Sequence, residues 1–380
     1  MTGTPSSLIP PANPHAAYLA QREAIDSAVR RVLDSGWYIL GCEVESFERE
    51  FAAWLGTAHA VGVANGTDAL ELALRAIHVG PGDEVIAPAH TASATIAAIE
   101  HAGAVPVLVD IEPQSYGIDP DKLATTIKDR RDRGRMKAIV VVHLYGHPAR
   151  LDDILTIAHG AGIPVVEDCA QAHGAREHGR PVGTFGAVAA FSFYPTKNLG
   201  ALGDGGAVAT NDGEINARVR MLREYGWRER YNSEAAGINS RLDELQAAIL
   251  RAKLPHLEGE NERRRHIASL YDHALRGAGA EGIFVRHDVV HAFHQYAVCH
   301  PRRDDWRSAL QKHGVGAAVL YPKPVHAQPA YSTRVPHGCG GLGTSERVCR
   351  EVLCLPVYPQ LSDEHVRRVA EAVAATLLAL

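Results

Sequence analysis

The sequence predicts an α/β fold with a mostly parallel sheet, followed by a smaller C-terminal α+β domain. First, short apolar runs alternate with helical patterns between residues 59 and 224, and this alternation is typical of a parallel sheet covered by helices on both faces. Second, the alternation stops near Pro255, where a long charged segment begins. Third, a chain of 380 residues, 46% of them hydrophobic, is large enough for two packed domains.

The N-terminal part of the chain precedes the predicted sheet. Residues 1–14 are rich in proline and serine, and we expect an extended N-terminal arm. Apolar spacing predicts a helix over residues 18–33 that ends at Ser35-Gly36, a stop signal. A second amphipathic helix is predicted over residues 43–55. Its apolar face carries Val44, Phe47, Phe51 and Trp54.

The sheet region is predicted from its alternating pattern. Strands are expected at residues 59–64, 84–87, 105–109, 137–143, 163–167, 188–193 and 206–210. Helices are expected at residues 66–77, 92–101, 119–127, 151–159 and 212–224. Ligands of such sheets bind at the carboxyl ends of the strands. Residues 225–240, which follow, show no regular pattern.

The C-terminal part is predicted to form the second domain. A helix over residues 241–253 closes a large domain of residues 15–254. A charged helix from Pro255 to about residue 276 then connects it to the small domain, so that residues 255–380 hold connector and small domain together. Further strands are expected at residues 296–299 and 318–321, and further helices at residues 304–312, from Ser345 and from Asp363.

Composition excludes several classes of protein. The formal net charge of −5 indicates no general attraction to nucleic acid. No apolar run approaches the roughly 18 residues of a membrane span, and the first residues lack the pattern of a secretory signal. The six cysteines show no CxxC spacing, so we expect reduced thiols and a cytoplasmic protein. The histidine pairs His143/His147 and His291/His294 do not predict a metal site, because the first pair spans a Leu-Tyr-Gly break.

Residues 187–206, AVAAFSFYPTKNLGALGDGG, place one lysine after an apolar strand. A surface lysine on a loop is the ordinary interpretation of such a residue. Hydroxyls at Ser192 and Thr196 flank Lys197. Glycines, which let backbone approach a ligand closely, follow at Gly200, Gly203, Gly205 and Gly206. This setting favours a lysine whose amine takes part in chemistry.

Three further positions at predicted strand ends offer partners to that lysine. Gly66 and Thr67 begin a helix after a strand, which indicates either a phosphate site or an ordinary helix cap made by Asn65 or Thr67. Asp168 follows the run IPVVE and either lines a site or caps a helix, and Gln171 and His173 lie close behind it.

Ser192 offers one more hydroxyl for a phosphate. An anion site, a carboxylate and a lysine at one sheet edge together fit pyridoxal 5'-phosphate. In that arrangement the lysine binds the cofactor covalently and Asp168 keeps its ring nitrogen protonated. No GxGxxG motif follows the early strands, which argues against a nicotinamide-dependent enzyme.

The chain resembles the DegT-type, fold-type I aminotransferases that act on nucleotide-linked keto-sugars in amino-sugar biosynthesis. The resemblance implies a seven-stranded, mostly parallel sheet in the large domain. It covers nearly the whole chain. The motifs that carry it are SGWYILGCEVESFEREFAAWLG (35–56), NGTDAL (65–70), HLYGHPARLD (143–152), EDCAQAHGA (167–175), FSFYPTKNLGALGDGGAV (191–208), NSRLDELQAAIL (239–250), YPKPVHAQPAY (321–331) and LPVYPQLSDEHV (355–366).

The resemblance implies a role for each matched residue. Lys197 is the Schiff-base lysine and proton shuttle, Asp168 pairs with the pyridinium nitrogen, and Gln171 lies on the side of the cofactor's hydroxyl. The phosphate is bound by Gly66, Thr67 and Ser192.

The remaining matched residues bring in a partner and the substrate. Asn239 reaches the phosphate from a neighbouring subunit, which implies a homodimer with shared sites. Tyr321 and His326 belong to the sugar-nucleotide site. The family usually places an aromatic ring at position 92 to stack on the cofactor, whereas this chain has Ala92, and His90 is the candidate replacement.

The resemblance also indicates the type of reaction and the acceptor sugar. Dehydratase relatives carry histidine where this chain has Lys197, and lysine favours transamination, with glutamate as the expected amino donor. The segment YGWRERYNS (225–233) resembles enzymes that aminate C3 of TDP-linked 3-keto-6-deoxyhexoses. The alternatives are a C4 nucleotide-sugar or cyclitol aminotransferase and, more remotely, a non-catalytic regulator that binds pyridoxal phosphate.

Overall fold

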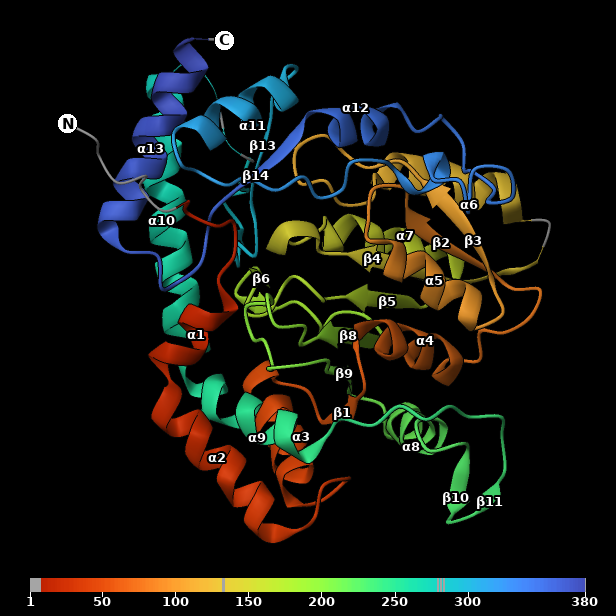
Figure 1. The fold of residues 1–380 in the computed structure, drawn as a ribbon. Coiled ribbons are helices and arrows are strands. Elements are labelled where there is room, and N and C mark those ends of the chain that lie inside the picture. The colour runs from red at the N-terminus through yellow and green to blue at the C-terminus, as the bar shows by residue number, and fades with distance from the viewer. Residues whose placement is uncertain (1–7, 132–133, 279, 281, 283, 380) are drawn as a thin grey trace.

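The computed structural model describes residues 8–131, 134–278, 280, 282 and 284–379. Its centre is a seven-stranded sheet with the strand order β1-β9-β8-β5-β4-β2-β3 (Figure 1). The strands are β1 (His59–Val63), β2 (Glu84–Pro88), β3 (Val105–Val109), β4 (Met136–Val142), β5 (Val165–Asp168), β8 (Val188–Ser192) and β9 (Gly206–Thr210). Only β9 runs antiparallel to both of its neighbours in this sheet. The predicted mostly parallel, seven-stranded α/β fold is therefore confirmed.

The helices begin and end close to the predicted positions. They are α1 (Pro14–Ala20), α2 (Arg22–Ser35), α3 (Cys42–Leu55), α4 (Gly66–Ala76), α5 (Ser93–His101), α6 (Pro120–Arg130), α7 (Leu151–Ala161), α8 (Gly213–Leu222), α9 (Glu244–Lys253), α10 (Leu257–Gly277), α11 (Arg303–Lys312), α12 (Gly343–Glu351) and α13 (Asp363–Leu378). None of the helices in the described ranges is long and apolar enough to cross a membrane.

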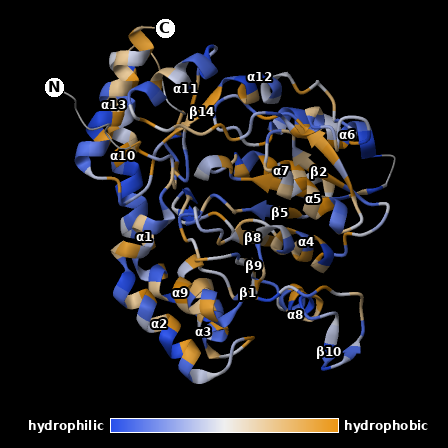
Figure 2. Ribbon diagram, in the orientation of Figure 1, coloured by the Kyte–Doolittle hydropathy of each residue, from blue (hydrophilic) through white to orange (hydrophobic). Residues whose placement is uncertain are grey.

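The sheet separates two hydrophobic layers. Along β4, Val140 and Val142 belong to one buried cluster, whereas Ile139 and Val141 belong to the other. This follows from the strand period of two, which points successive side chains to opposite faces. Helices α4, α5 and α8 supply the first layer, and α3, α6, α7 and α9 supply the second. Figure 2 shows hydrophobic residues gathered where α5 and α7 meet the strands.

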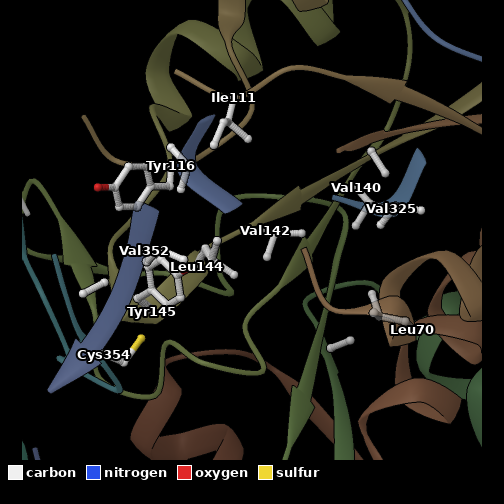
Figure 3. Close-up of a cluster of buried hydrophobic side chains, with 14 of the residues drawn as sticks. Leu70, Ile111, Tyr116, Val140, Val142, Leu144, Tyr145, Val325, Val352 and Cys354 are labelled. Carbon is white, nitrogen blue, oxygen red and sulfur yellow. The ribbon is translucent and has the colours of Figure 1, made fainter. Parts of the chain in front are cut away.

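The first hydrophobic layer continues into the C-terminal part of the chain. There β13 (Tyr296–Cys299) pairs with β14 (Val352–Leu355), and α10, α11 and α13 pack beside them. Figure 3 shows Tyr116, Leu144 and Tyr145 from the sheet region beside Val352 and Cys354 of β14. The two parts of the chain therefore share one core. The division into an arm, residues 15–254 and residues 255–380 stays a prediction.

Short elements surround the ends of the sheet. β12 (Val289–Val290), β6 (Arg176–Glu177) and β7 (Arg180–Pro181) form a small antiparallel sheet. The 3₁₀ turns are η2 (Leu144–Gly146), η3 (Leu254–His256) and η4 (Val325–Ala327). The connection between β8 and β9 joins neighbouring antiparallel strands, and its first paired residues are Ser192 and Gly206.

Several local predictions differ from the structure. The helix predicted over residues 18–33 is two helices, α1 and α2, which meet at Gln21. Residues 318–321 form no strand, because β13 pairs with β14 and leaves only an isolated bridge between Ala318 and Cys354. The strand β14 was not predicted.

Residues 225–240, for which no regular structure was predicted, contain the hairpin β10 (Trp227–Glu229) and β11 (Asn232–Ser233), which projects beyond α8 (Figure 1). The predicted N-terminal arm lies partly outside the described residues, namely over residues 1–7. Its described part is held down, since the buried Ile9 pairs with Val315.

Candidate functional site

A cavity of about 510 Å³ lies at the carboxyl edge of the sheet. Its walls are the ends of β4, β5 and β8, the starts of α4 and α5, the loop after β8 and one residue of the C-terminal part, Tyr321. A cavity of this size at this edge is suited to a cofactor with a small substrate.

The structure brings most of the predicted site residues together in this cavity. Those that line it are Gly66, Thr67, Ala92, Asp168, Gln171, Ser192, Lys197 and Tyr321. They come from segments separated by more than 250 residues in the sequence, so only the fold joins them. Three predicted residues, His90, Asn239 and His326, are not among the lining residues.

The start of α4 forms one end of the cavity. Asn65 caps this helix, because its side-chain oxygen accepts a hydrogen bond from Asp68 N–H at 2.9 Å. Capping and anion binding are compatible here, since the first N–H groups of a helix have no intrahelical acceptors and its dipole favours negative charge. A Cβ atom at Gly66 would lie 2.5 Å from Ser192 Cβ, so glycine is needed to bring the Ser192 hydroxyl against this helix start. The resulting cradle of amides and a hydroxyl fits a phosphate group.

Asp168 ends β5 and is almost fully buried. Its Oδ2 accepts a hydrogen bond from Thr95 Oγ1 at 3.0 Å, and its Oδ1 accepts one from Ala170 N–H at 3.1 Å. Burial raises the pKa of this carboxyl above its ordinary value. A buried carboxylate is stable when a cation faces it, and a protonated ring nitrogen would be such a cation. Residues 169–175 are turns and irregular backbone, so Asp168 caps no helix and that alternative is wrong.

Lys197 lies in the turn after β8, where its N–H donates to Tyr194 O at 2.8 Å. It lines the cavity and is not a freely exposed surface lysine. Burial lowers the pKa of its amine to about 8, and the negative charge of Asp168 opposes part of this shift. A large share of the amine is therefore neutral near pH 8, as a nucleophile or base requires.

The glycines after Lys197 act differently from our expectation. A Cβ at Gly200 would lie 2.5 Å from Pro195 O, and one at Gly206 would lie 2.4 Å from Asn65 O. These close neighbours are atoms of the chain itself. The loop between β8 and β9, residues 193–205, is called the lysine loop below. The glycines pack this loop tightly on itself and against the start of α4, and they do not line the cavity.

His90 does not cover the cavity, which corrects the expectation that it replaces a stacking ring. It is fully buried, and its two ring nitrogens contact Tyr145 Oη at 2.8 Å and Cys349 Sγ at 3.0 Å. The next two residues of the chain, Thr91 and Ala92, do line the cavity. The β2–α5 connection thus turns its small side chains toward the cavity and its histidine toward the C-terminal part.

Asn239 and His326 lie away from the cavity of their own chain. Asn239 pairs with Glu224 at the base of the hairpin. His326 lies on η4, where its Nε2 is 3.1 Å from Glu346 Oε1 and its ring contacts His337. A role for Asn239 requires a second subunit, in keeping with the expectation for it.

Sequence reasoning missed several residues of the cavity. Thr95 holds the carboxylate of Asp168, and Thr91 Oγ1 lies 2.8 Å from Thr95 Oγ1. Tyr194 and Asp204, from the lysine loop, also line the cavity. The available signal for Thr95 was its place in the first turn of a helix that follows a strand of the same sheet.

One buried cluster has the composition of a metal site, namely His143, Glu167 and Cys169. His143 Nε2 lies 3.1 Å from Glu167 Oε2, and its Nδ1 accepts a hydrogen bond from Ala149 N–H. Glu167 also accepts hydrogen bonds from N–H groups of the loop over residues 183–186. These partners occupy His143 and Glu167, and Glu167 joins the loop over residues 183–186 to β5.

Comparisons with known proteins agree with this geometry. Residues 20–374 match the model of the DegT/DnrJ/EryC1/StrS aminotransferase family. The chain is 47% identical over 359 residues to a dTDP-3-amino-3,4,6-trideoxy-alpha-D-glucose transaminase of Streptomyces venezuelae, with 94% of this chain and 93% of the relative covered. Among solved structures, DesV of S. venezuelae superposes with a TM-score of 0.93 at 46% identity, covering 98% of this chain and 99% of that chain. NtdA of Bacillus subtilis, with its bound cofactor PMP, superposes with a TM-score of 0.89 at 29% identity, covering 99% of this chain and 87% of that chain.

Proposed function

The chain belongs to the DegT/DnrJ/EryC1/StrS aminotransferase family and is a pyridoxal-phosphate-dependent aminotransferase, and we propose that it aminates C3 of a TDP-linked 3-keto-6-deoxyhexose. One observation carries the catalytic part of this proposal. A single cavity holds a lysine whose pKa burial lowers to about 8, a buried carboxylate and a helix start that fits a phosphate. The relative with 47% identity, named as a transaminase for a 3-amino sugar on dTDP, supports the choice of substrate.

Lys197 is the catalytic residue in this proposal. When bound, pyridoxal phosphate supplies an electron sink for chemistry at a carbon that carries an amino group. Lys197 holds the cofactor covalently between turnovers, and its amine moves the proton at the reacting carbon. The lowered pKa of about 8 keeps part of the amine neutral, as a proton acceptor needs.

Asp168 and the phosphate cradle orient the cofactor from its two ends. Thr95 and Ala170 each bind one oxygen of Asp168, so the carboxylate has one fixed orientation toward the cavity. Gly66, Thr67 and Ser192 surround the other end, where the phosphate belongs. A ligand held at both ends keeps its reacting atom at a constant distance from Lys197.

The substrate side of the cavity is assigned to Tyr321, and Gln171, expected on the side of the cofactor's hydroxyl, contacts it. Gln171 Nε2 donates to Tyr321 Oη at 3.1 Å, so the two side chains form one polar wall. Ala92 also lines the cavity and offers no ring. We assign no stacking residue from this chain, and the sugar or a partner subunit fills that space in our proposal.

We also propose a homodimer with shared sites. Asn239 lies outside the cavity of its own chain, beside a projecting hairpin. Large aromatic side chains are exposed on the same molecule, with Trp37 62% and Tyr231 76% exposed. Exposed aromatic side chains of this size favour contact with another protein surface. Sedimentation velocity of the purified protein tests the dimer, and a monomer that is fully active would contradict it.

The location and the amino donor complete the proposal. All six cysteines are free thiols, the state that the reducing cytoplasm maintains, so we propose a cytoplasmic enzyme. Glutamate is the proposed donor, because the reaction needs an abundant primary amine with an α-hydrogen.

The substrate is tested by comparing acceptors. Protein loaded with pyridoxal phosphate is incubated with glutamate and either a 3-keto or a 4-keto TDP-sugar, and the amino sugar is identified by mass spectrometry and NMR. We expect the 3-amino product. A 4-amino product, or amination of a cyclitol alone, would replace the proposed acceptor. Binding of the cofactor without turnover of any acceptor would favour the regulator.

A further inference from the structure

We propose that His90 and Tyr145 form a positioning pair that fixes Tyr321 and Gln171 in the substrate wall of the cavity. Both residues are buried, and neither lines the cavity. This inference rests on the proposed function for its kinetic consequence, because Tyr321 is there assigned to the keto-sugar. Its structural consequence is independent of the substrate.

The pair connects three separate parts of the chain. His90 follows β2, and Tyr145 lies in η2 after β4. The Tyr145 hydroxyl donates a hydrogen bond to the carbonyl of Leu320, the residue directly before Tyr321. Figure 3 shows Tyr145 beside Leu144, which lines the cavity. The carbonyl that begins the substrate wall is therefore held from inside the core.

The direction of these hydrogen bonds follows from counting protons. Tyr145 has a single hydroxyl proton and gives it to Leu320, so His90 Nε2–H must donate to Tyr145 Oη at 2.8 Å. In a neutral imidazole the other nitrogen is then an acceptor, and Cys349 Sγ lies 3.0 Å from Nδ1 as its thiol donor. The chain of donors runs from Cys349 through His90 and Tyr145 to Leu320.

The protonation states agree with this direction. Burial lowers the pKa of His90 to about 4 and raises the pKa of Cys349 to about 12. At neutral pH the imidazole is therefore uncharged and the thiol keeps its proton. A charged imidazole would leave Nδ1 without acceptor capacity and would break the chain at Cys349.

Tyr145 reaches the substrate wall by a second route. Its backbone N–H donates to Gln171 Oε1 at 2.6 Å, and Gln171 Nε2 donates to Tyr321 Oη at 3.1 Å. The hydroxyl of Tyr145 thus fixes the backbone before Tyr321, while its amide fixes the amide group that binds the Tyr321 ring. The backbone before Tyr321 and the hydroxyl of its side chain therefore both depend on Tyr145.

The backbone of Tyr145 lies in the left-handed region, with φ of 59° and ψ of 0°. This conformation is unfavourable for a residue other than glycine, and it persists when surrounding contacts hold it. Those contacts include the hydrogen bonds to Leu320 and Gln171 and the one from Gln295 N–H to Tyr145 O at 3.1 Å. Tyr145, whose backbone is in this unfavourable conformation, therefore makes both hydrogen bonds, to Leu320 and to Gln171, that lead to Tyr321.

The segment after Tyr321 is anchored next to His90 as well. Val325 N–H donates to the carbonyl of Ala89 at 3.0 Å. The segment that supplies Tyr321 is therefore tied to the β2–α5 connection at one point directly, through Ala89, and at another through His90 and Tyr145. Between these two points the chain enters the cavity.

The first test is Tyr145→Phe, with Tyr271→Phe as the matched control. Both tyrosines are fully buried, and each donates its hydroxyl proton to a backbone carbonyl, that of Leu320 or Pro356. Tyr271 lies on α10, away from the cavity. Both variants should unfold at a lower temperature than the wild type, but only Tyr145→Phe should raise the KM for the keto-sugar, by about tenfold, with kcat and the KM for glutamate nearly unchanged.

The second test uses His90 and the rescue of one hydrogen bond. In His90→Gln the side-chain amide can still donate to Tyr145 Oη, whereas His90→Leu cannot. We expect the KM for the keto-sugar to stay close to the wild-type value in His90→Gln and to rise about tenfold in His90→Leu. The double variant His90→Leu/Tyr145→Phe should show no further rise, because both changes break the same chain.

A crystal structure of Tyr145→Phe tests the positioning without any substrate. We expect Tyr321 Oη to lie beyond hydrogen-bond distance of Gln171. An unchanged Tyr321, or equal KM values in Tyr145→Phe and Tyr271→Phe, would overturn the inference. If the wild type turns over no nucleotide-linked keto-sugar but Tyr321 moves in the crystal, the proposed function fails while the positioning pair stands.

Discussion

The two walls of the cavity are built in different ways. The cofactor wall, the part of the cavity that we assign to the cofactor, consists of residues that end a strand or begin a helix, such as Gly66, Asp168 and Ser192. The substrate wall depends on Tyr321, which lies in an irregular segment tied to the core by side chains. Secondary structure therefore places the cofactor groups, and buried tertiary hydrogen bonds place the substrate group. We expect changes in the first wall to abolish chemistry and changes in the second wall to weaken substrate affinity.

The largest effect is expected at Lys197. Lys197→Ala removes the only group in the cofactor wall to which we assign proton transfer, so kcat should fall about 10⁴-fold. The visible absorption band that the wild type shows after addition of pyridoxal phosphate should also disappear, while circular dichroism shows a folded protein. Appreciable turnover by this variant would remove the distinction between the two walls.

Asp168→Asn tests the charge at the other end of the cofactor. The amide can keep the contact with Thr95 but carries no negative charge, so kcat should fall about 10²–10³-fold. Thr95→Val, which leaves the carboxylate in place, serves as the milder comparison. If Asp168→Asn raised only the KM for the sugar, Asp168 would belong to the substrate wall.

Gly66→Ala tests the close packing of the phosphate cradle. The new Cβ would lie 2.5 Å from Ser192 Cβ, so the helix start and the strand end must separate. Overpacking of this kind costs about 1–3 kcal/mol, and we expect the dissociation constant of the cofactor to rise about tenfold. Equilibrium dialysis with pyridoxal phosphate measures it. Gly80→Ala, at a glycine where a Cβ would meet no atom within 4 Å, is the control.

The pH dependence of stability tests the surroundings of Lys197. Burial lowers the pKa of its amine from the ordinary 10.5 to about 8 in the folded protein. Between these values the unfolded chain binds more protons, so the free energy of unfolding of the cofactor-free protein should rise with pH. Below about pH 8 both states are protonated and this contribution no longer changes. The free energy of unfolding, measured by denaturant titration, should depend on pH with different slopes in the wild type and in Lys197→Met. Equal slopes would show that the Lys197 amine is exposed to solvent in the folded protein.

The smallest effect is expected at His326, a residue of the segment that follows the substrate wall. Its Nε2 contacts Glu346, away from the cavity of its own chain. His326→Ala should change the KM for the keto-sugar less than about threefold, because Glu346 is exposed and a pair with an exposed partner contributes little. A larger rise would show that the segment reaches the substrate by a route other than Tyr321.

Sequence reasoning brought the residues of the cofactor wall to one edge of the sheet, because regular structure determines where they lie. A residue that follows an apolar strand must lie at the carboxyl edge of the sheet, so Asp168, Ser192 and Lys197 converge without knowledge of any distant contact. The same reasoning predicted the succession of strands and helices along most of the chain that forms the large sheet.

The errors arose where a distant segment decides the outcome. His90 and Ala92 belong to one short connection, but the partners that hold the histidine away from the cavity, Tyr145 and Cys349, come from distant segments. Likewise, residues 318–321 have the composition of a strand, yet β14 pairs with β13 instead. Nothing in the local pattern of either segment contains that information.

The connection between β8 and β9 has a consequence for how the enzyme tolerates change. Connections between β1 and β5 in the large sheet pass through helices, which can slide on a sheet as side chains vary. The lysine loop instead joins adjacent strands whose pairing starts at Ser192 and Gly206. A slip by one residue would turn every side chain of the strand to the other face. The pairing of β8 with β9 therefore fixes the position of the Lys197 amine. Substitutions elsewhere in the core can accumulate without moving this amine.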